Sequence, residues 1–362
     1  MDPLNTSGPT SGAAEAQKLD MILVTGVTGA GKSYFINQLA GREVVEEGRD
    51  LKSCKPTKAF VTPNLFSTTI TNNIPLQGTQ KCRMIPLSLG ASKCLLIDTP
   101  GFDDTHRSDS EILAEIAQLL AVQYKSGIKL KGIIYIHRIS DIKYTGSAVN
   151  TFEIFRRLCG DEALGNVMLV TSHWNKVTRS EGSDRERQLR SDFWSYMLMR
   201  GSKLSRFHGD RDSARGLVSQ ILMNDPVVLA LQREIIDQGL DLNKTEAGSY
   251  VGKGLGDRQD RYQSELRTIK GRLAEPQVSP QEKRQLEQDR DKAINHLAAQ
   301  ENQAQILGQN VQSQVAQKTK WKRNLFARTV AATIPVCLEI MASLIGFDGL
   351  FDFESWLGFD EY

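Results

Sequence analysis

The residues best suited to chemistry lie in a glycine-rich segment near the N-terminus, Gly26–Ser33, which matches the pattern G-x-x-x-x-G-K-S. An apolar run of strand type precedes this segment and a helical pattern follows it. That context is the one a phosphate-binding P-loop requires. Glycines permit the turns and close approaches that point successive N–H groups at a phosphate chain, and the positive end of the following helix faces the same anion. We therefore predict a nucleotide phosphate site here.

The P-loop motif predicts individual roles for its residues. Lys32 would place a mobile positive charge on the β- and γ-phosphates, and the Ser33 hydroxyl would bind Mg²⁺. Thr57 is the nearest candidate for a further residue at the metal site. An ordinary loop threonine that faces solvent is an equal alternative for Thr57. A glycine-rich turn without a ligand is the alternative for the whole segment. The predicted nucleotide-contacting residues here are Gly26, Val27, Thr28, Gly29, Ala30, Gly31, Lys32, Ser33 and Tyr34.

A second motif, D-x-x-G, spans Asp98–Gly101 at the end of a hairpin predicted from the apolar runs Arg83–Leu89 and Lys93–Ile97. At a strand end, Asp98 can hold a water bound to Mg²⁺, and the N–H of Gly101 can meet the γ-phosphate. We therefore predict Asp98 as a nucleotide- and metal-site residue, and Gly101 together with Lys32 as catalytic residues. The pattern is common in turns, so its weight comes from its place after a P-loop.

Phe102 follows Gly101 where Ras-type proteins place the glutamine that orients the attacking water. An apolar ring cannot orient water, so intrinsic hydrolysis should be slow unless another group arrives. The polar residues Asp103–His106 are close enough in sequence to be considered as that group. A mobile switch loop is the favoured interpretation of this stretch.

The residues expected at the nucleotide base follow a predicted buried strand, Asn166–Thr171. GTPases place N-K-x-D or T-K-x-D there, and its carboxylate accepts two hydrogen bonds from guanine. The aligned residues here begin at Ser172 and end at Asn175, whose amide presents an N–H donor where the second acceptor is needed. We predict that Ser172, His173 and Asn175 lie at the base. Selectivity for guanine is an inference, because the motif here lacks its carboxylate. His173 or Trp174 could stack on the base or pack against the next helix.

Strand and helix patterns alternate across the region of these motifs, which indicates a doubly wound α/β domain. A capping box, Ser108 with Glu111, predicts a helix directly after the D-x-x-G loop. The apolar run Gly132–Ile136 predicts a buried strand that ends at His137 and Arg138. Strand ends of this kind hold ligand and interface groups in α/β proteins, and a solvent-facing pair is the alternative.

The chain from Asp225 onward is predicted to be largely helical, and its first helix belongs to the α/β domain. Asp225 and Pro226 suggest the start of a helix over Val227–Gln238. From Asp257 the composition turns rich in Gln, Glu, Lys, Arg and Ala, and prolines interrupt the helical pattern before a second stretch from Gln281 to about Lys318. The apolar positions hold no clean heptad, so a helical hairpin or arm is favoured over a long parallel coiled coil. A solvated helix without a partner is the alternative.

An apolar run near the C-terminus, Thr329–Phe347, has about the length of a short membrane span. Basic residues before it would keep the rest of the chain in the cytosol, whereas Glu339 near its middle is costly in lipid. Two interpretations stay open: membrane association as a tail anchor or interfacial helix, and docking on the protein or on a partner. The expected location is the cytoplasm, with anchoring to an intracellular membrane by the C-terminus as an option.

Composition narrows the class of protein. The chain has 362 residues and a net charge of +2, a balance that predicts no nucleic-acid partner. Its five cysteines are scattered and lack C-x-x-C spacing, which fits a reducing compartment and argues against a disulfide framework or a zinc site. The predicted parts are a disordered lead-in (1–19), a nucleotide-binding domain (20–250), a helical arm (251–324), and an apolar segment with an acidic, aromatic tail (325–362).

Together these motifs resemble the septin-related branch of the translation-factor-class GTPases, namely the AIG/GIMAP family, the Toc import-receptor GTPases and the fungal G domain-containing proteins. The resemblance covers roughly residues 20–250. It implies a three-layer P-loop NTPase G domain that binds GTP or GDP with Mg²⁺, has a hydrophobic residue in place of the catalytic glutamine and dimerises across its nucleotide face. The segments that carry it are Gly26–Ser33, Asp98–Asp104, Gly132–Asp141, Leu231–Glu234 and Thr245–Gly248.

The function expected from the sequence is that of a GTP-binding switch or assembly module with slow, Mg²⁺-dependent hydrolysis. The alternative is a nucleotide-binding scaffold with little hydrolysis that interacts through its helical arm. A membrane-tethered form of either rests on residues 329–347.

Overall fold

The computed structural model describes residues 19–45, 47, 81–90, 92–104, 107–317, 338 and 341. Thr57 lies outside the described residues, as do the N-terminal lead-in and, apart from Leu338 and Met341, the apolar run near the C-terminus. The predictions made for these parts therefore stay predictions. Within the described ranges, no helix combines the length and the apolar character that crossing a membrane requires.

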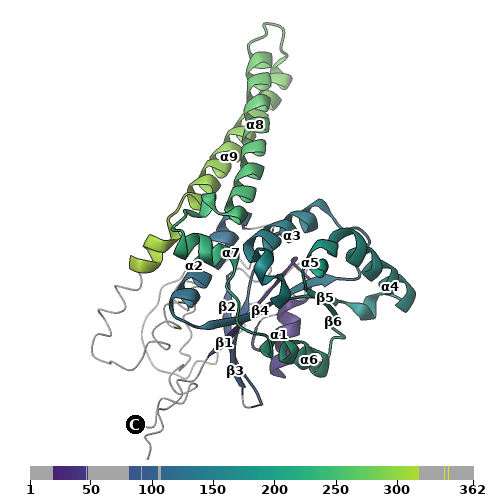
Figure 1. Cartoon of the computed structure of the whole chain (residues 1–362). Coiled ribbons are helices and arrows are strands. Elements are labelled where there is room, and N and C mark those ends of the chain that lie inside the picture. The colour runs from purple at the N-terminus through teal and green to yellow at the C-terminus, as the bar shows by residue number, and fades with distance from the viewer. Residues whose placement is uncertain are drawn as a thin grey trace, which may run out of the picture.

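In the part of the chain that the structure describes, a six-stranded sheet with the strand order β2-β3-β1-β4-β5-β6 forms the centre of the domain (Figure 1). The β2–β3 pair is the predicted hairpin and is antiparallel, whereas the pairs β3–β1, β1–β4, β4–β5 and β5–β6 are parallel. The predicted mostly parallel sheet is thus confirmed. The strands are β1 (Asp20–Gly26), β2 (Arg83–Leu89), β3 (Ser92–Asp98), β4 (Lys129–Arg138), β5 (Val167–Ser172) and β6 (Lys203–Arg206).

Helices cover both faces of the sheet, because successive residues of a buried strand point to opposite faces. On β1, Ile22 and Val24 pack in one apolar cluster with α1 and α6, while Met21 and Leu23 pack in a second cluster with α2 and α3. The result is the predicted three-layer α/β domain. These helices are α1 (Lys32–Ala40), α2 (Asp109–Lys125), α3 (Gly146–Cys159) and α6 (Arg211–Leu222), and α4 (Arg179–Gln188) and α5 (Ser195–Met199) lie between β5 and β6 in the chain.

The capping box at the start of α2 is confirmed. The Ser108 hydroxyl accepts the N–H of Glu111 at 3.3 Å, and the Glu111 carboxylate accepts the N–H of Ser108 at 2.8 Å. This reciprocal pair satisfies two N–H groups that the first turn of a helix leaves unpaired. It fixes the start of α2 a few residues after the D-x-x-G motif.

The helix predicted to begin at Val227 begins later. The N–H of Val227 donates to the carbonyl of Leu130 at 2.8 Å, and the N–H of Leu229 donates to the side chain of Gln232 at 2.9 Å. Because the strand and a side chain take these N–H groups, the chain stays non-helical up to Leu229. Helix α7 (Ala230–Gln232) then continues as a π-helical turn (Arg233–Asp237).

Helices α8 (Glu246–Leu273) and α9 (Pro280–Leu307) form a hairpin that projects from the α/β domain (Figure 1). The rings of Tyr262 and His296 stack with centroids 4.9 Å apart, and Arg258 donates to Gln300 at 3.1 Å. The residue numbers of the contacting partners rise along α8 as they fall along α9, so the two helices are antiparallel. The predicted hairpin is thus present.

The second helix of the hairpin is shorter than the sequence suggested. Helix α9 ends at Leu307, and a separate helical segment covers residues 311–317. This segment lies against α2, where Gln118 donates to Gln314 at 2.8 Å. The break lets the chain turn back onto the α/β domain, a tertiary contact that composition cannot reveal.

Candidate functional site

The P-loop connects β1 to α1 at the edge of the sheet where the parallel strands end. Gly26, Gly29 and Gly31 have φ values of 138°, 74° and 86°, a region that side chains with a Cβ rarely adopt. Gly26 is also restricted by space, because a Cβ there would lie 2.1 Å from the carbonyl oxygen of Ile136 on β4. The loop therefore has the backbone turns that the motif predicted.

Lys32 lies inside this loop with 7% of its surface exposed. Its ammonium donates hydrogen bonds to the carbonyls of Gly26 at 3.1 Å and Val27 at 3.0 Å. Burial lowers the pKa of Lys32, while the nearby carboxylates, Asp98 first among them, act to raise it. The cation thus sits where the motif would place it beside a phosphate.

Ser33 and Asp98 join the two motifs. The Ser33 hydroxyl lies 3.5 Å from the Asp98 carboxylate, which is fully buried at the end of β3. Next to it, the N–H and the hydroxyl of Thr99 both donate to the carbonyl of Val24 at 3.1 Å, and so hold the D-x-x-G segment against β1. The predicted neighbours, which are far apart in sequence, thus lie side by side.

The oxygen donors of Ser33 and Asp98 suit Mg²⁺. This ion prefers oxygen ligands, keeps several waters and is usually held by one or two carboxylates together with substrate phosphates. Within the described ranges, there is no group of three or more His, Cys, Asp or Glu side chains that could hold a metal ion. One carboxylate and one hydroxyl fit a Mg²⁺ ion that takes its remaining ligands from water and phosphate.

Phe102 is buried, with 4% of its surface exposed, in the apolar cluster that contains α2. Its burial explains why the residue after Gly101 is apolar in this chain. The next residue, Asp103, faces the P-loop, where its carboxylate accepts the N–H of Thr28 at 2.6 Å. The sequence had grouped Asp103 with a mobile loop, and no local pattern indicated this contact.

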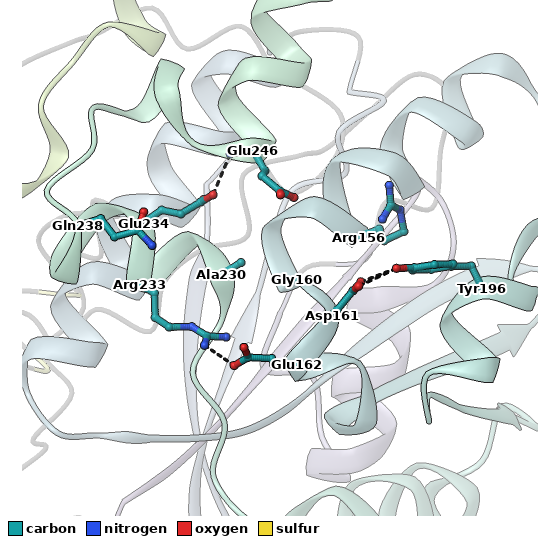
Figure 2. A pocket seen from close by; sticks show the side chains of 10 residues that line it. All are labelled: Arg156, Gly160, Asp161, Glu162, Tyr196, Ala230, Arg233, Glu234, Gln238 and Glu246. Atoms are coloured by element: carbon teal, nitrogen blue, oxygen red, sulfur yellow. Dashed lines mark hydrogen bonds and ion pairs between the residues drawn. The ribbon is translucent and has the colours of Figure 1, made fainter.

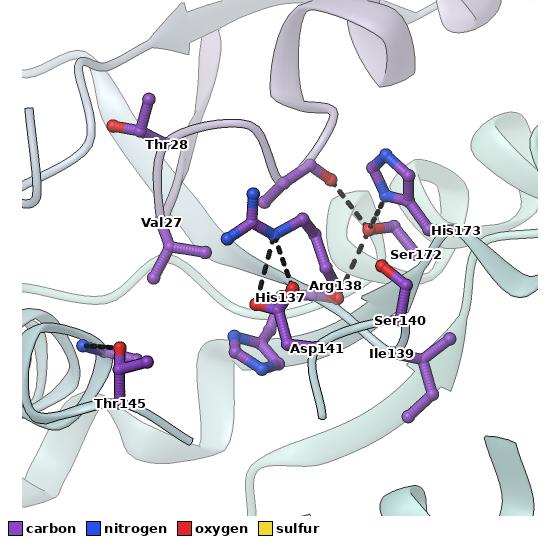
Figure 3. A network of polar contacts seen from close by, with 12 residues as sticks. Val27, Thr28, His137, Arg138, Ile139, Ser140, Asp141, Thr145, Ser172 and His173 are labelled. Atoms are coloured by element: carbon purple, nitrogen blue, oxygen red, sulfur yellow. Dashed lines mark hydrogen bonds and ion pairs between the residues drawn. The ribbon is translucent and has the colours of Figure 1, made fainter. Parts of the chain in front are cut away.

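Arg138, at the end of β4, reaches the P-loop. A guanidinium nitrogen of Arg138 lies 2.9 Å from the position that a Cβ on Gly29 would occupy. Asp141 holds the same guanidinium at 2.9 Å, as Figure 3 shows. Arg138 therefore adds a second positive charge beside the loop that contains Lys32.

His137, the neighbour of Arg138, belongs to the core. Its ring is 2% exposed and packs against Tyr144 and Trp194, with centroid distances of 5.0 and 6.0 Å. Burial lowers the pKa of His137 to about 4, so the ring is neutral near pH 7. The two residues that end β4 thus have different surroundings.

The end of β5 is tied to the P-loop by Ser172. Its hydroxyl lies 2.7 Å from the carbonyl of Ala30, 3.2 Å from that of His137 and 3.0 Å from Nδ1 of His173 (Figure 3). His173 adopts a left-handed backbone with φ 61°, and its ring carbon Cε1 lies 3.4 Å from the position of a Cβ on Gly31. Ser172 and His173 therefore border the P-loop, and their predicted place at the nucleotide base stays a prediction.

Trp174 takes the second of the two alternatives, packing against the protein. Its indole N–H lies 3.2 Å from the carbonyl of Thr171, and the Arg206 guanidinium lies 4.1 Å from the ring centroid. A Cβ on Gly182 in α4 would lie 2.6 Å from this ring, so the helix packs closely on it. Asn175 is exposed in the short turn that follows. The packing of Trp174 leaves His173 as the ring from this segment that borders the P-loop.

A separate cavity of about 440 Å³ lies between the end of α3, α5, α7 and the start of α8 (Figure 2). The Tyr196 hydroxyl donates to Asp161 at 2.7 Å, Arg233 pairs with Glu162, and Glu234 accepts the N–H of Glu246 at 3.1 Å. Side chains that pair with one another thus form much of this wall. None of the predicted nucleotide residues lines the cavity.

Comparisons with known proteins give no family. No family model matches the sequence, and no curated protein matches it.

Three solved structures are similar to part of this chain. Toc33 from Arabidopsis thaliana, in complex with Mg²⁺ and GMPPNP, is 16% identical over 59% of this chain and 89% of that chain, with a TM-score of 0.40. Elongation factor SelB from Methanococcus maripaludis, in complex with a GTP analogue, is 11% identical over 57% and 34%, with a TM-score of 0.35. Era from Aquifex aeolicus, bound to GDP and AlF4⁻, is 14% identical over 58% of each chain, also with a TM-score of 0.35. Similarities this remote assign neither a family nor an activity to this chain.

Proposed function

We propose that this chain is a GTP-binding protein that hydrolyses GTP slowly with Mg²⁺ and acts as a nucleotide-controlled switch or assembly module. The observation that carries the proposal is the 3.5 Å contact between the Ser33 hydroxyl and the Asp98 carboxylate. It joins a P-loop to a D-x-x-G segment, which is the pairing that phosphoryl-transfer sites of this class use to hold Mg²⁺ and the γ-phosphate.

In the proposed mechanism, the N–H groups of the P-loop and the start of α1 bind the phosphates. Lys32, already buried in the loop, would face the β- and γ-phosphates. Ser33 and Asp98 would hold Mg²⁺, which when bound neutralises charge on the phosphate oxygens. Thr57 stays a prediction for a further metal-site residue.

Hydrolysis in such a site depends on stabilising the charge that develops on the transferred phosphoryl group. The N–H of Gly101 and the charge of Lys32 would do this. The guanidinium of Arg138, which lies beside Gly29, would add a further positive charge. The buried ring of Phe102 cannot orient the attacking water. We therefore expect slow turnover by the isolated chain.

Guanine is the proposed base, and the residues at the end of β5 support it. Ser172 and His173 border the P-loop, and exposed Asn175 follows them where a guanine-binding carboxylate is expected. One amide oxygen can accept one of the two hydrogen bonds that guanine offers. The resemblance of the motifs to the AIG/GIMAP, septin-related and fungal G domain proteins supports the same base, and also dimerisation across the nucleotide face.

A scaffold with little hydrolysis is the second candidate, and the projecting α8–α9 hairpin favours it. Much of the hairpin surface is exposed and charged, which suits a solvated arm that presents an interaction surface. Such a protein would bind nucleotide for structure rather than for turnover.

Single-turnover hydrolysis at increasing protein concentration separates the two candidates. A GTPase that assembles would show slow turnover that rises with concentration, and Ser33→Ala would raise the Mg²⁺ concentration that turnover requires. A scaffold would retain bound nucleotide without turnover at any concentration.

Membrane tethering through residues 329–347 stays a separate proposal. Vesicle flotation of the full chain and of a chain without residues 325–362 tests it. Equal partitioning of the two would rule the tether out.

A further inference from the structure

Asp103 is the polar residue that the D-x-x-G loop brings into the P-loop. Its carboxylate accepts the N–H of Thr28 at 2.6 Å, across 75 positions of sequence. The turn that presents it is held by the N–H of Asp104, which donates to the carbonyl of Gly101 at 3.2 Å. The contact therefore links the two segments that flank the proposed γ-phosphate.

Gly101 is the residue that allows this approach. A Cβ on Gly101 would lie 2.6 Å from the Thr28 hydroxyl, 2.7 Å from the Thr28 nitrogen and 2.8 Å from the bonded oxygen of Asp103. Thr28 and the Asp103 carboxylate thus both lie close against the backbone of Gly101. In the proposed site, the N–H of Gly101 is the group that meets the γ-phosphate.

The charge of Asp103 acts on the same site. Lys32 is buried in the loop, and among the charges that act on it Asp103 comes second after Asp98, both favouring its protonated form. A diphosphate adds no group beside Gly101. A triphosphate adds a negatively charged group there, and like charges this close repel strongly where protein excludes water.

From this geometry, which rests on the proposed nucleotide site, we infer that Asp103 is a specificity-determining residue that discriminates between nucleoside diphosphate and triphosphate. Its carboxylate docks on the Thr28 N–H when the γ position is empty or a diphosphate is bound. A γ-phosphate must displace this carboxylate before it can contact Gly101. Asp103 therefore favours the diphosphate state and couples the presence of a γ-phosphate to the position of the residue after Phe102.

A purely structural role for Asp103 would have a different signature. A carboxylate that only satisfies a backbone N–H contributes to stability equally in both nucleotide states. The ratio of the two nucleotide affinities distinguishes the roles, because a fold effect cancels in that ratio.

The test measures the dissociation constants of GDP and GTPγS with Mg²⁺ for the full chain and three variants. Asp103→Asn keeps an oxygen that can accept the Thr28 N–H but removes the charge. Asp103→Ala removes both the accepting oxygen and the charge. This variant provides the test if circular dichroism shows that Asp103→Asn does not fold. Asp257→Asn is the control, because it removes the same charge at an exposed position on the helical arm.

We expect both Asp103 variants to tighten GTPγS about tenfold relative to GDP, the factor that corresponds to roughly 1.4 kcal/mol. The control should leave the ratio within about twofold. An unchanged ratio in both Asp103 variants, with both nucleotides bound, overturns the inference and leaves the proposed function intact. Failure of the unmodified chain to bind either nucleotide overturns the proposed function, and the inference with it.

Discussion

The hydroxyl of Ser172 donates a hydrogen bond of 2.7 Å to the backbone carbonyl of Ala30. Ser172 ends β5 and Ala30 lies in the loop after β1, so the bond crosses the end of β4, which lies between those strands. Both residues are buried. The bond connects the segment proposed for the base to the segment proposed for the phosphates.

Replacing Ser172 by alanine should loosen this connection. The variant leaves the carbonyl of Ala30 without its partner, so we expect a loss of about 1–2 kcal/mol in the free energy of unfolding and a several-fold weaker affinity for GDP. Urea denaturation and GDP titration measure the two effects. Ser191→Ala is the control, since Ser191 is exposed and should change stability by less than about 0.5 kcal/mol. Equal behaviour of the two variants would show that the bond has no such role.

Gly26 should tolerate no side chain. A Cβ there meets the carbonyl oxygen of Ile136 at 2.1 Å, at a φ of 138°, so Gly26→Ala should destabilise the fold by about 3 kcal/mol. Gly216, inside α6, has open space within 4 Å of the position that an alanine methyl group would occupy, and Gly216→Ala should stabilise the helix by about 0.5–1 kcal/mol. Thermal unfolding of the pair checks both signs. A Gly26→Ala protein as stable as the parent chain would contradict the close approach of the loop to β4.

Much of the fold followed from local patterns. The alternation of buried strands with amphipathic helices, the hairpin and the Ser108 capping box all depend on residues that are neighbours in sequence. Predictions were wrong where tertiary contacts decided the outcome. The N–H of Val227 pairs with Leu130 instead of starting a helix, and the helix after Pro280 breaks at Gly308 before the chain returns to α2.

Asp109 should make stability depend on pH. Burial raises the pKa of its carboxyl to about 6 from an ordinary value of 3.8. Between these values the folded chain binds more protons than the unfolded chain, so the free energy of unfolding falls as pH rises through this window. Asp109→Asn should match the parent chain below about pH 4 and exceed its stability by on the order of 2 kcal/mol above pH 6.

Urea denaturation of both proteins from pH 4 to 7 measures the difference attributable to Asp109. His137, whose pKa is lowered by burial, acts in the opposite direction but is present in both proteins and cancels. A difference that is constant over this range would show that Asp109 does not titrate there.

Asn175 should weaken the preference for guanine over adenine. Asn175→Asp restores a carboxylate that can accept both hydrogen bonds from guanine, so the preference for GDP over ADP should rise about tenfold, or roughly 1.4 kcal/mol. Competition titrations with the two nucleotides measure it. Asn243→Asp adds the same charge at an exposed position beside the start of α8 and should leave the preference unchanged. A preference that does not move in Asn175→Asp would place the base elsewhere.

The candidate site was predictable to a similar extent as the fold. Lys32, Ser33, Asp98 and Gly101 could be named because their spacing and flanking elements specify them. The position of Arg138 beside Gly29 and the contact of Asp103 with Thr28 could not, because each joins segments that only the sheet order brings together. The packing of Trp174 against α4 likewise required the position of Gly182.

Titration of the full chain with GDP and Mg²⁺, alongside Lys32→Ala, tests the central claim most directly. Lys32 supplies the charge within the loop, so we expect saturable binding by the parent chain and a loss of affinity of about 100-fold in the variant, or roughly 2.7 kcal/mol. Lys253→Ala, on the helical arm, should bind as the parent chain does. A parent chain that binds no nucleotide, or a Lys32→Ala variant that binds GDP as tightly as the parent, would contradict the account.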